Sequence, residues 1–451
     1  MSFTSPIFAV FVAAIFVAYY AFGNSNWQIT LLVLASLVFY SADNLQLLPI
    51  LVTAVAITYA TMLAASRGSW LGASLGIAAN LSILAFFKYK LLIIDPEHWQ
   101  HSDVPWLNYL VLLPLPIGIS FFVFHNISAI VDHYKVAKNP PTFLDLTMYI
   151  IFFPQLVSGP ITRASGFFPQ IEYKHLRAVP CVQAAKLLIL GYFMKLYAAD
   201  NLSEFTAWMA PETMGRLGGG DRLLMVFLYS CQIYADFLGY STIALGLALL
   251  FGYRLPINFN LPYTASSFSD FWNKWHISLS TWLRVYLYIP LGGSRGPTWQ
   301  TYLNLLIVMG LGGLWHGASL NYLAWGLYHG LLLVGERMMG LRDSRSKSAW
   351  GYVRVAFVFV TVSFAWLLFR FTHLSDAVSY VGGLRTGLSF NFAPEIYLAA
   401  ALSALPVIIQ HVGPAQAISR FKAFEPALYG VMLALAIFAR GPTTTFIYFR
   451  F

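Results

Sequence analysis

The chain has 451 residues, of which 58% are hydrophobic, 17% are aromatic and only 10% carry a charge. A soluble domain has roughly a quarter of its residues charged, so this chain has too few charged side chains to cover a surface in water. The composition excludes an ordinary soluble protein and predicts an integral membrane protein.

The net charge is +9, from 27 Lys and Arg against 18 Asp and Glu. No basic stretch with interleaved aromatic residues accompanies it, so nucleic acid is not an expected partner. In a protein that crosses the bilayer repeatedly, excess Lys and Arg mostly lie in cytoplasmic loops. We therefore expect the basic loops 163–177 and 336–354 on the cytoplasmic side. The two cysteines provide neither a disulfide framework nor a zinc site, and no metal is expected.

The apolar runs of the chain are continuous, whereas strands of a membrane barrel would alternate polar and apolar residues. We therefore expect an all-α fold. Several runs fall short of the about 20 residues that a helical span needs, which indicates about eleven tilted crossings together with re-entrant and interfacial helices. The runs centre on residues 6–22, 28–41, 46–64, 70–87, 108–131, 143–158, 182–199, 223–251, 302–315, 320–335, 353–371, 396–410 and 428–439.

The segment 254–300 is too polar to span a bilayer and too aromatic for an ordinary loop. Its stretch "DFWNKWHISLSTWLRVYLY" combines six aromatic residues with Lys274, His276 and Arg284. This pattern is typical of an amphipathic helix at the headgroup level, followed by a piece that dips into the protein. An interfacial anchor with snorkelling cations accounts for the aromatic residues and Arg284, but not well for His276.

Residues 303–335 contain no formally charged group over 33 positions and include "GGLWHGASLNYLAWGLYHG". The run is too long for one span and too short for two of about 20 residues each. Glycines cluster around His316, so we expect a helix that is broken near His316 inside the membrane, as in many membrane binding sites. His329 is expected to be a hydrogen-bonded residue of the next helix. The glycines are Gly310, Gly312, Gly313 and Gly317.

Four segments occur in a defined order along the chain: "FFPQLVSGPITR" (152–163), "YADFLGYSTIALG" (234–246), "FWNKWHISLSTWLRVYLYIPLGG" (271–293) and "GGLWHGASLNYLAWGLYHG" (312–330). Together they resemble the bacterial membrane-bound O-acyltransferase family, and the similarity is greatest to the membrane subunits of alginate and peptidoglycan O-acetylation. The resemblance implies tilted helices around a central tunnel, in one membrane domain over residues 1–451 with a catalytic core at about 110–340. It also implies a multi-pass protein of the bacterial inner (cytoplasmic) membrane.

The two signature histidines of that family correspond to His276 and His316, 40 positions apart. The resemblance implies that His316 is catalytic and that His276 lies near the cytoplasmic entrance of the donor, as a second catalytic or donor-orienting residue. A histidine base can take the proton of an acceptor hydroxyl and return it to the leaving thiolate. Trp315, or backbone N–H groups freed at the helix break, could donate to the oxyanion. No carboxylate stands beside His316 in the sequence, so no triad is assigned.

Further candidates for substrate or donor binding each have a structural alternative. Arg163, Lys274 and Arg284 are cations that could attract a phosphate of the donor or anchor the chain at the cytoplasmic surface. Asp236 is an acid in an apolar run, which is either functional or the partner of a nearby cation or tyrosine hydroxyl. Trp275 completes the set, through its place in the signature.

The leading hypothesis is an O-acyltransferase that moves acetyl groups from a cytoplasmic thioester across the membrane, for O-acetylation of a cell-envelope polysaccharide or peptidoglycan. The donor would be acetyl-coenzyme A or the phosphopantetheine of an acyl carrier, with no tightly bound cofactor. A periplasmic or extracellular O-acetyltransferase of serine esterase type is the implied protein partner, beside the lipid bilayer. One alternative is D-alanyl transfer to teichoic acid. Another is a flippase or transporter of a lipid-linked sugar, but the sequence lacks the paired repeats or intramembrane charges that this needs.

Overall fold

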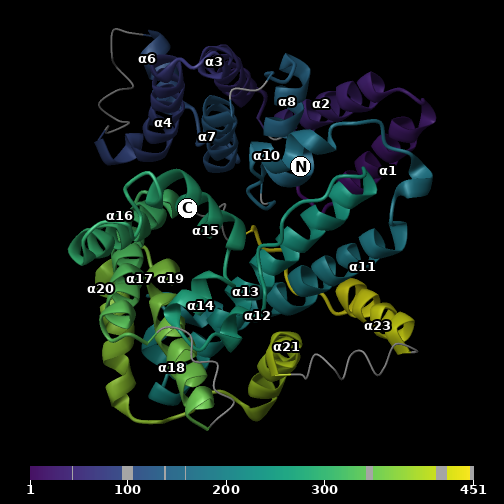
Figure 1. Ribbon diagram of the computed structural model, residues 1–451. Coiled ribbons are helices and arrows are strands. Elements are labelled where there is room, and N and C mark those ends of the chain that lie inside the picture. Colours follow the sequence, from purple (N-terminus) through teal and green to yellow (C-terminus); the bar gives the residue numbers. More distant parts are fainter. Residues whose placement is uncertain are drawn as a thin grey trace. The chain divides into compact units, whose positions relative to one another are not determined.

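The computed structural model describes residues 1–42, 44–93, 105–136, 139–157, 159–341, 349–412 and 424–446. These residues form helices and loops, with no β-strand among them (Figure 1). The expectation of an all-α fold is confirmed. Part of the second basic loop (342–348) and the last residues (447–451) lie outside the described residues.

Six helical stretches in the described chain are long and apolar enough to cross a bilayer, and three shorter apolar helices accompany them. The protein is therefore a multi-pass membrane protein, while the number of eleven crossings stays a prediction. The six stretches are Leu45–Ser66, Trp70–Lys90, Cys181–Met209, Gly219–Leu250, Ala349–Arg370 and Pro394–Val412, and the shorter helices are Pro6–Ala21, Ser25–Ser41 and Glu425–Phe438.

The chain divides into two compact units. The first, here called the N-terminal unit, comprises Met1–Ala185 and Ala244–Pro256. The second, the C-terminal unit, comprises Lys186–Ile243 and Ile257–Phe451. The single-domain organisation with a core at about 110–340 stays a prediction.

The N-terminal unit buries aromatic side chains between its helices. Phe8, Phe39 and Phe153 pack with ring centroids 5.7–6.3 Å apart, within the range of favourable aromatic pairs. Its helices are α1 (Pro6–Ala21), α2 (Ser25–Ser41), α3 (Leu48–Ser66), α4 (Trp70–Ile93), α6 (Pro105–Leu112), α7 (Ile119–Val136), α8 (Phe143–Ile151), α9 (Phe153–Leu156) and α10 (Ala164–Phe167).

The apolar run 108–131 forms two helices and not the single span expected. α6 ends at Leu112 and α7 begins at Ile119. The connection contains two prolines, which cannot donate to a helix, and Gly118, whose φ of +69° is left-handed. Local backbone chemistry therefore interrupts the helix despite the continuous hydrophobicity.

The C-terminal unit contains the segments with the two signature histidines. Two π-helical stretches, Phe193–Ala199 and Arg284–Tyr288, occur in it, and such stretches are frequent at functional sites. α11 (Cys181–Tyr192) and α13 (Gly219–Leu250) contribute residues to both units. The other helices are α12 (Asp200–Thr206), α14 (Phe268–Trp272), α15 (Ile277–Leu283), α16 (Thr298–His316), α17 (Leu320–Met338), α18 (Ala349–Ala365), α19 (Leu367–Arg370), α20 (Leu374–Gly382), α21 (Pro394–Val412) and α23 (Glu425–Phe438).

Candidate active site

A helical hairpin places His316 at a chain reversal. α16 ends at His316, Gly317 is extended, and Ser319 caps α17 by accepting a hydrogen bond from the N–H of Asn321 (3.2 Å). The two helices then run back along each other. The interruption near His316 is therefore found, but it is a turn between two antiparallel helices and not a break within one helix.

The glycines that predicted the break have another role. Gly310 and Gly313 lie inside α16 and face α17, which approaches closely, whereas a Cβ added to Gly312 would meet Leu283 of α15. A Cβ added to Gly313 would lie 2.1 Å from the carbonyl oxygen of Tyr322, and one added to Gly326 would lie 2.2 Å from that of Met309. Small residues at such crossings allow the close van der Waals packing that joins helices in membranes.

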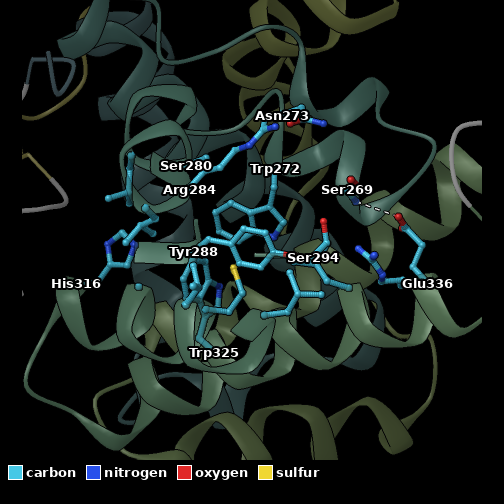
Figure 2. A pocket seen from close by; sticks show the side chains of 18 residues that line it. Ser269, Trp272, Asn273, Ser280, Arg284, Tyr288, Ser294, His316, Trp325 and Glu336 are labelled. Carbon is cyan, nitrogen blue, oxygen red and sulfur yellow. Dashed lines mark hydrogen bonds between the residues drawn. The ribbon is translucent and has the colours of Figure 1, made fainter. Parts of the chain in front are cut away.

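A cavity of about 380 Å³ lies beside this hairpin in the C-terminal unit. Figure 2 shows His316 and Glu336 on opposite sides of it, with Trp272 and Tyr288 between them. The cavity is large enough to hold part of a small substrate. The polar residues that line it are Ser269, Asn273, Ser280, Arg284, Tyr288, Ser294, His316, Glu336 and Arg337, and the apolar ones include Trp272, Leu279, Leu283, Leu305, Val308, Met309, Trp325 and Leu333.

His316 is only 5% exposed and sits among aromatic rings. Its imidazole centroid lies 5.0 Å from the ring of Trp315, 5.2 Å from that of Trp325 and 4.9 Å from that of Phe369. These rings restrict the orientation of the imidazole while its other side faces the cavity. A histidine held in this way can act as a general base toward a group in the cavity.

His276 lies at the turn between α14 and α15 and is 1% exposed. Its ring contacts Phe237 (4.6 Å between centroids) and Trp315 (6.0 Å). Trp315 therefore lies against both signature histidines, while the described residues that line the cavity do not include His276. Burial lowers the pKa of His276 to about 3, so this imidazole is neutral at physiological pH.

The segment 254–300 differs from the expected amphipathic helix at the membrane surface. It forms two short helices, α14 and α15, with the turn at His276 between them. Trp275 is 2% exposed and packs against Trp366 (4.7 Å between centroids) and Phe259 (5.0 Å). Phe271 and Trp282 are buried as well, so these aromatic residues pack inside the protein, which hydrophobic patterning alone does not distinguish from a lipid-facing stripe.

The three cations expected to bind the donor have different surroundings in the structure. Lys274 forms an ion pair with Asp270 (2.8 Å) and donates to Thr264 Oγ1 (3.2 Å). Arg284 is exposed and lines the cavity. Arg163 is exposed at the start of α10 in the N-terminal unit and contributes nothing to this cavity.

Asp236 is part of a buried ion cluster. Lys195 Nζ lies 2.8 Å from Asp236 Oδ1 and 2.7 Å from Asp200 Oδ1. It also donates to the carbonyl oxygen and the hydroxyl of Thr444, both at 3.0 Å. This arrangement corresponds to the structural alternative for Asp236, a partner for a nearby cation.

Glu336 is a cavity residue that the sequence analysis placed only in a basic loop. Its carboxylate accepts hydrogen bonds from the backbone N–H groups of Phe268 and Ser269 (3.3 Å for Ser269), at the start of α14. It is 6% exposed. The signal that could have found it is its place as the first charged residue after the charge-free run, at the end of α17.

His329 is not the hydrogen-bonded residue expected. It is fully buried, and neither ring nitrogen has a hydrogen-bond partner within the described part of the chain. Instead its imidazole packs against Trp325 (4.8 Å), Trp272 (5.2 Å) and Phe271 (6.1 Å). Aromatic packing on three sides has taken the place of polar partners.

The fold and site thus define a multi-pass membrane enzyme with a histidine facing a cavity. A model of the membrane-bound O-acyltransferase family, MBOAT, matches residues 62–374. The chain belongs to this family and is an O-acyltransferase, as its sequence resemblance implied.

Three relatives illustrate the range of the family. The probable alginate O-acetylase AlgI of Azotobacter vinelandii is 35% identical, over 84% of this chain and 76% of the relative. The peptidoglycan O-acetyltransferase of Helicobacter pylori is 34% identical, over 78% of this chain and 73% of the relative. The teichoic acid D-alanyltransferase of Bacillus subtilis is 29% identical, over 57% of this chain and 66% of the relative.

Proposed function

We propose that this protein transfers acetyl groups from a cytoplasmic thioester across the membrane for O-acetylation of a cell-envelope polysaccharide or peptidoglycan. The observation that carries the proposal is His316, buried among aromatic rings with one side open to the cavity. The names of the relatives support the acetyl group and the type of polymer, since they are alginate and peptidoglycan O-acetylating proteins.

In the proposed reaction His316 is the general base. The acceptor hydroxyl attacks the thioester carbonyl carbon while His316 takes the hydroxyl proton. The C–O bond forms, the C–S bond then breaks, and His316 returns the proton to the leaving sulfur. In this proposal the oxyanion accepts a hydrogen bond from an N–H at the turn after His316, or from the indole N–H of Trp315, which is not among the described residues that line the cavity.

The charged residues of the cavity suit a donor that carries phosphate. Arg284 and Arg337 both line it, and guanidinium groups bind phosphate oxygens in pairs of hydrogen bonds. Acetyl-coenzyme A and a carrier-bound phosphopantetheine share this chemistry. In the proposal neither is a tightly bound cofactor, because each is consumed as a substrate.

The proposal places the protein in the bacterial inner membrane with a periplasmic or extracellular O-acetyltransferase of serine esterase type as its partner. Its support is the amount of chain in membrane helices, which leaves no large separate domain among the described residues to hold a polymer. The partner would complete the transfer to the polymer.

The test replaces His316 by Ala and by Gln in cells whose own copy of the gene is deleted. Loss of a general base costs about 10²- to 10⁴-fold, so we expect ester-linked acetate on envelope polymers to fall to background. His373→Ala changes an exposed histidine of the same unit and should leave acetate unchanged. Normal acetate in correctly inserted His316→Ala would reject the assignment. Alkali-released D-alanine in place of acetate would instead favour teichoic acid D-alanylation.

A further inference from the structure

His276 has a backbone conformation that non-glycine residues rarely adopt. Its φ and ψ are 43° and 53°, in the left-handed region. Leu261 is the other non-glycine residue with positive φ in the described chain. Such conformations are strained, and they persist only where the surrounding structure imposes them.

The stretch 258–260 lies alongside the turn and bonds to its backbone on both sides of His276. The N–H of Asn260 donates to the carbonyl oxygen of Lys274 (3.0 Å), and the N–H of Ile277 donates to that of Asn258 (2.9 Å). Because these bonds lie on either side of His276, they hold the backbone in place before and after the strained residue.

The side chain of Asn258 adds a second set of bonds. Its Nδ2 donates to Ser241 Oγ (2.7 Å) on α13, and its Oδ1 accepts from Ser278 Oγ (2.6 Å) in the first turn of α15. Asn258 and Ser241 are each 1% exposed and Ser278 is 5% exposed. Ser241 lies one helical turn beyond Phe237, the residue whose ring contacts His276.

We infer that Asn258 is a positioning residue that holds His276 in its left-handed conformation, against Phe237 and Trp315. Without its amide, α15 is no longer tied to α13 at this point, and the backbone of His276 can relax. The inference rests on the proposed function only for the effect on activity, since the conformation of His276 can be measured separately.

The conformational test is chemical labelling of histidines. Diethyl pyrocarbonate modifies accessible neutral imidazoles, and peptide mass spectrometry of the full-length protein in detergent locates each modified residue. In the wild type His276 is buried, and we expect it to stay unmodified. In Asn258→Ala and in Ser278→Ala we expect modification at His276, while the fully buried His329 stays protected.

Asn80→Ala is the matched control. Asn80 is a fully buried amide in the N-terminal unit whose side chain makes three hydrogen bonds, to Thr58, Gly76 and Asn126, against two for the side chain of Asn258. Its removal costs a comparable set of buried bonds, so it should leave His276 protected. Protection of His276 in both Asn258→Ala and Ser278→Ala would overturn the inference, as would joint labelling of His276 and His329.

Two further readouts separate positioning from general stability. A misplacement of about 1 Å can lower the rate about 100-fold, so we expect Asn258→Ala to lower kcat to that extent at little changed KM. His276→Gly should have a higher melting temperature than His276→Ala, because glycine adopts positive φ without strain. An equal or lower melting temperature for the glycine variant would count against strain. Full activity of His276→Gln would reject the proposed role of His276 in transfer, while the labelling would still test Asn258.

Discussion

Trp315 links the two signature histidines at the level of single residues. Its indole lies against the rings of both His276 and His316, although 40 positions separate the two in the chain. The sequence predicts each histidine but not this contact, because the contact depends on how the hairpin packs against the turn at His276. Any movement of the indole will therefore change the ring contacts of both histidines.

The first prediction concerns the pH dependence of stability. Burial lowers the pKa of His276 to about 3 from its ordinary value of 6.5. Between these values the unfolded chain binds a proton that the folded chain excludes, so stability is present above pH 6.5 and falls as the pH drops. The slope is at most about 1.4 kcal/mol per pH unit.

His276→Gln should therefore flatten the dependence of the melting temperature on pH between about 4 and 6. The measurement is thermal unfolding in detergent across this range. His373→Gln, at an exposed histidine, serves as the comparison and should keep the wild-type slope. Parallel curves for wild type and His276→Gln would contradict the prediction.

The second prediction concerns Glu336. Its replacement by Ala removes the acceptor of the N–H groups of Phe268 and Ser269. The N–H of Phe268 is buried, and a buried donor left without a partner costs about 1–3 kcal/mol. Glu336→Gln retains one acceptor oxygen and should lose less. Thermal unfolding ranks the three proteins, and equal melting temperatures for the Ala and Gln variants would show that the hydrogen bonds contribute little.

At the scale of elements, the hairpin of α16 and α17 depends on closely packed glycines. Gly326 and Gly335 lie on the same helix, but only Gly326 faces the neighbouring backbone, at 2.2 Å from a hypothetical Cβ. Gly335 has nothing within 4 Å. This pair gives the third prediction a matched control.

Gly326→Ala should destabilise the protein by about 1–3 kcal/mol through overpacking. Gly335→Ala should be neutral or stabilising by up to about 1 kcal/mol, since alanine is the better helix former. Both are measured as shifts of the melting temperature, together with acetylation in cells. Similar shifts for the two variants would argue against the close approach of the helices.

The positions of most helices could be predicted from the apolar runs of the sequence, because each helix has a long apolar surface. The interruptions of two segments could not be predicted in this way. The run 108–131 is divided by prolines and Gly118, and the segment 254–300 turns at His276. The turn at His276 cannot be predicted from the pattern of apolar and polar residues. The left-handed conformation of His276 is held by two backbone hydrogen bonds of its neighbours, from Ile277 to Asn258 and from Asn260 to Lys274. The sequence does not show that these residues are paired.

At the scale of the whole molecule, the Lys195 cluster joins elements far apart in the chain. Lys195 and Asp200 belong to the long stretch Cys181–Met209, Asp236 to α13 and Thr444 to the segment after α23. In the ion pairs described, both buried carboxylates have the ammonium group of Lys195 as their cation. Removing one partner of a buried ion pair leaves an uncompensated charge.

The fourth prediction follows from this dependence. Lys195→Met should destabilise the protein by about 3–5 kcal/mol. The triple variant Lys195→Met, Asp200→Asn, Asp236→Asn should recover part of this loss, because it removes the charges as well. The yield of monodisperse protein and its melting temperature in detergent test both, and a triple variant no better than Lys195→Met would contradict the explanation.

The candidate site was thus only partly predictable. His316 at an interruption, and the family, followed from glycines, a charge-free run and ordered motifs. Glu336 in the cavity, the aromatic packing of His329 and the ion pair of Lys274 with Asp270 did not. Each depends on which helices become neighbours, and a single sequence does not specify that.

The ion cluster also has a consequence for biosynthesis. Thr444 follows Lys195 by 249 residues, and chains grow at about 5–20 residues per second, so about 12–50 s pass between the synthesis of the two. During that interval the cluster lacks the hydroxyl and the carbonyl of Thr444, to which Lys195 donates in the finished chain. We therefore expect chains that stall before Thr444 to hold the buried ion cluster without two of its hydrogen-bond acceptors, and so to be less stable than finished chains.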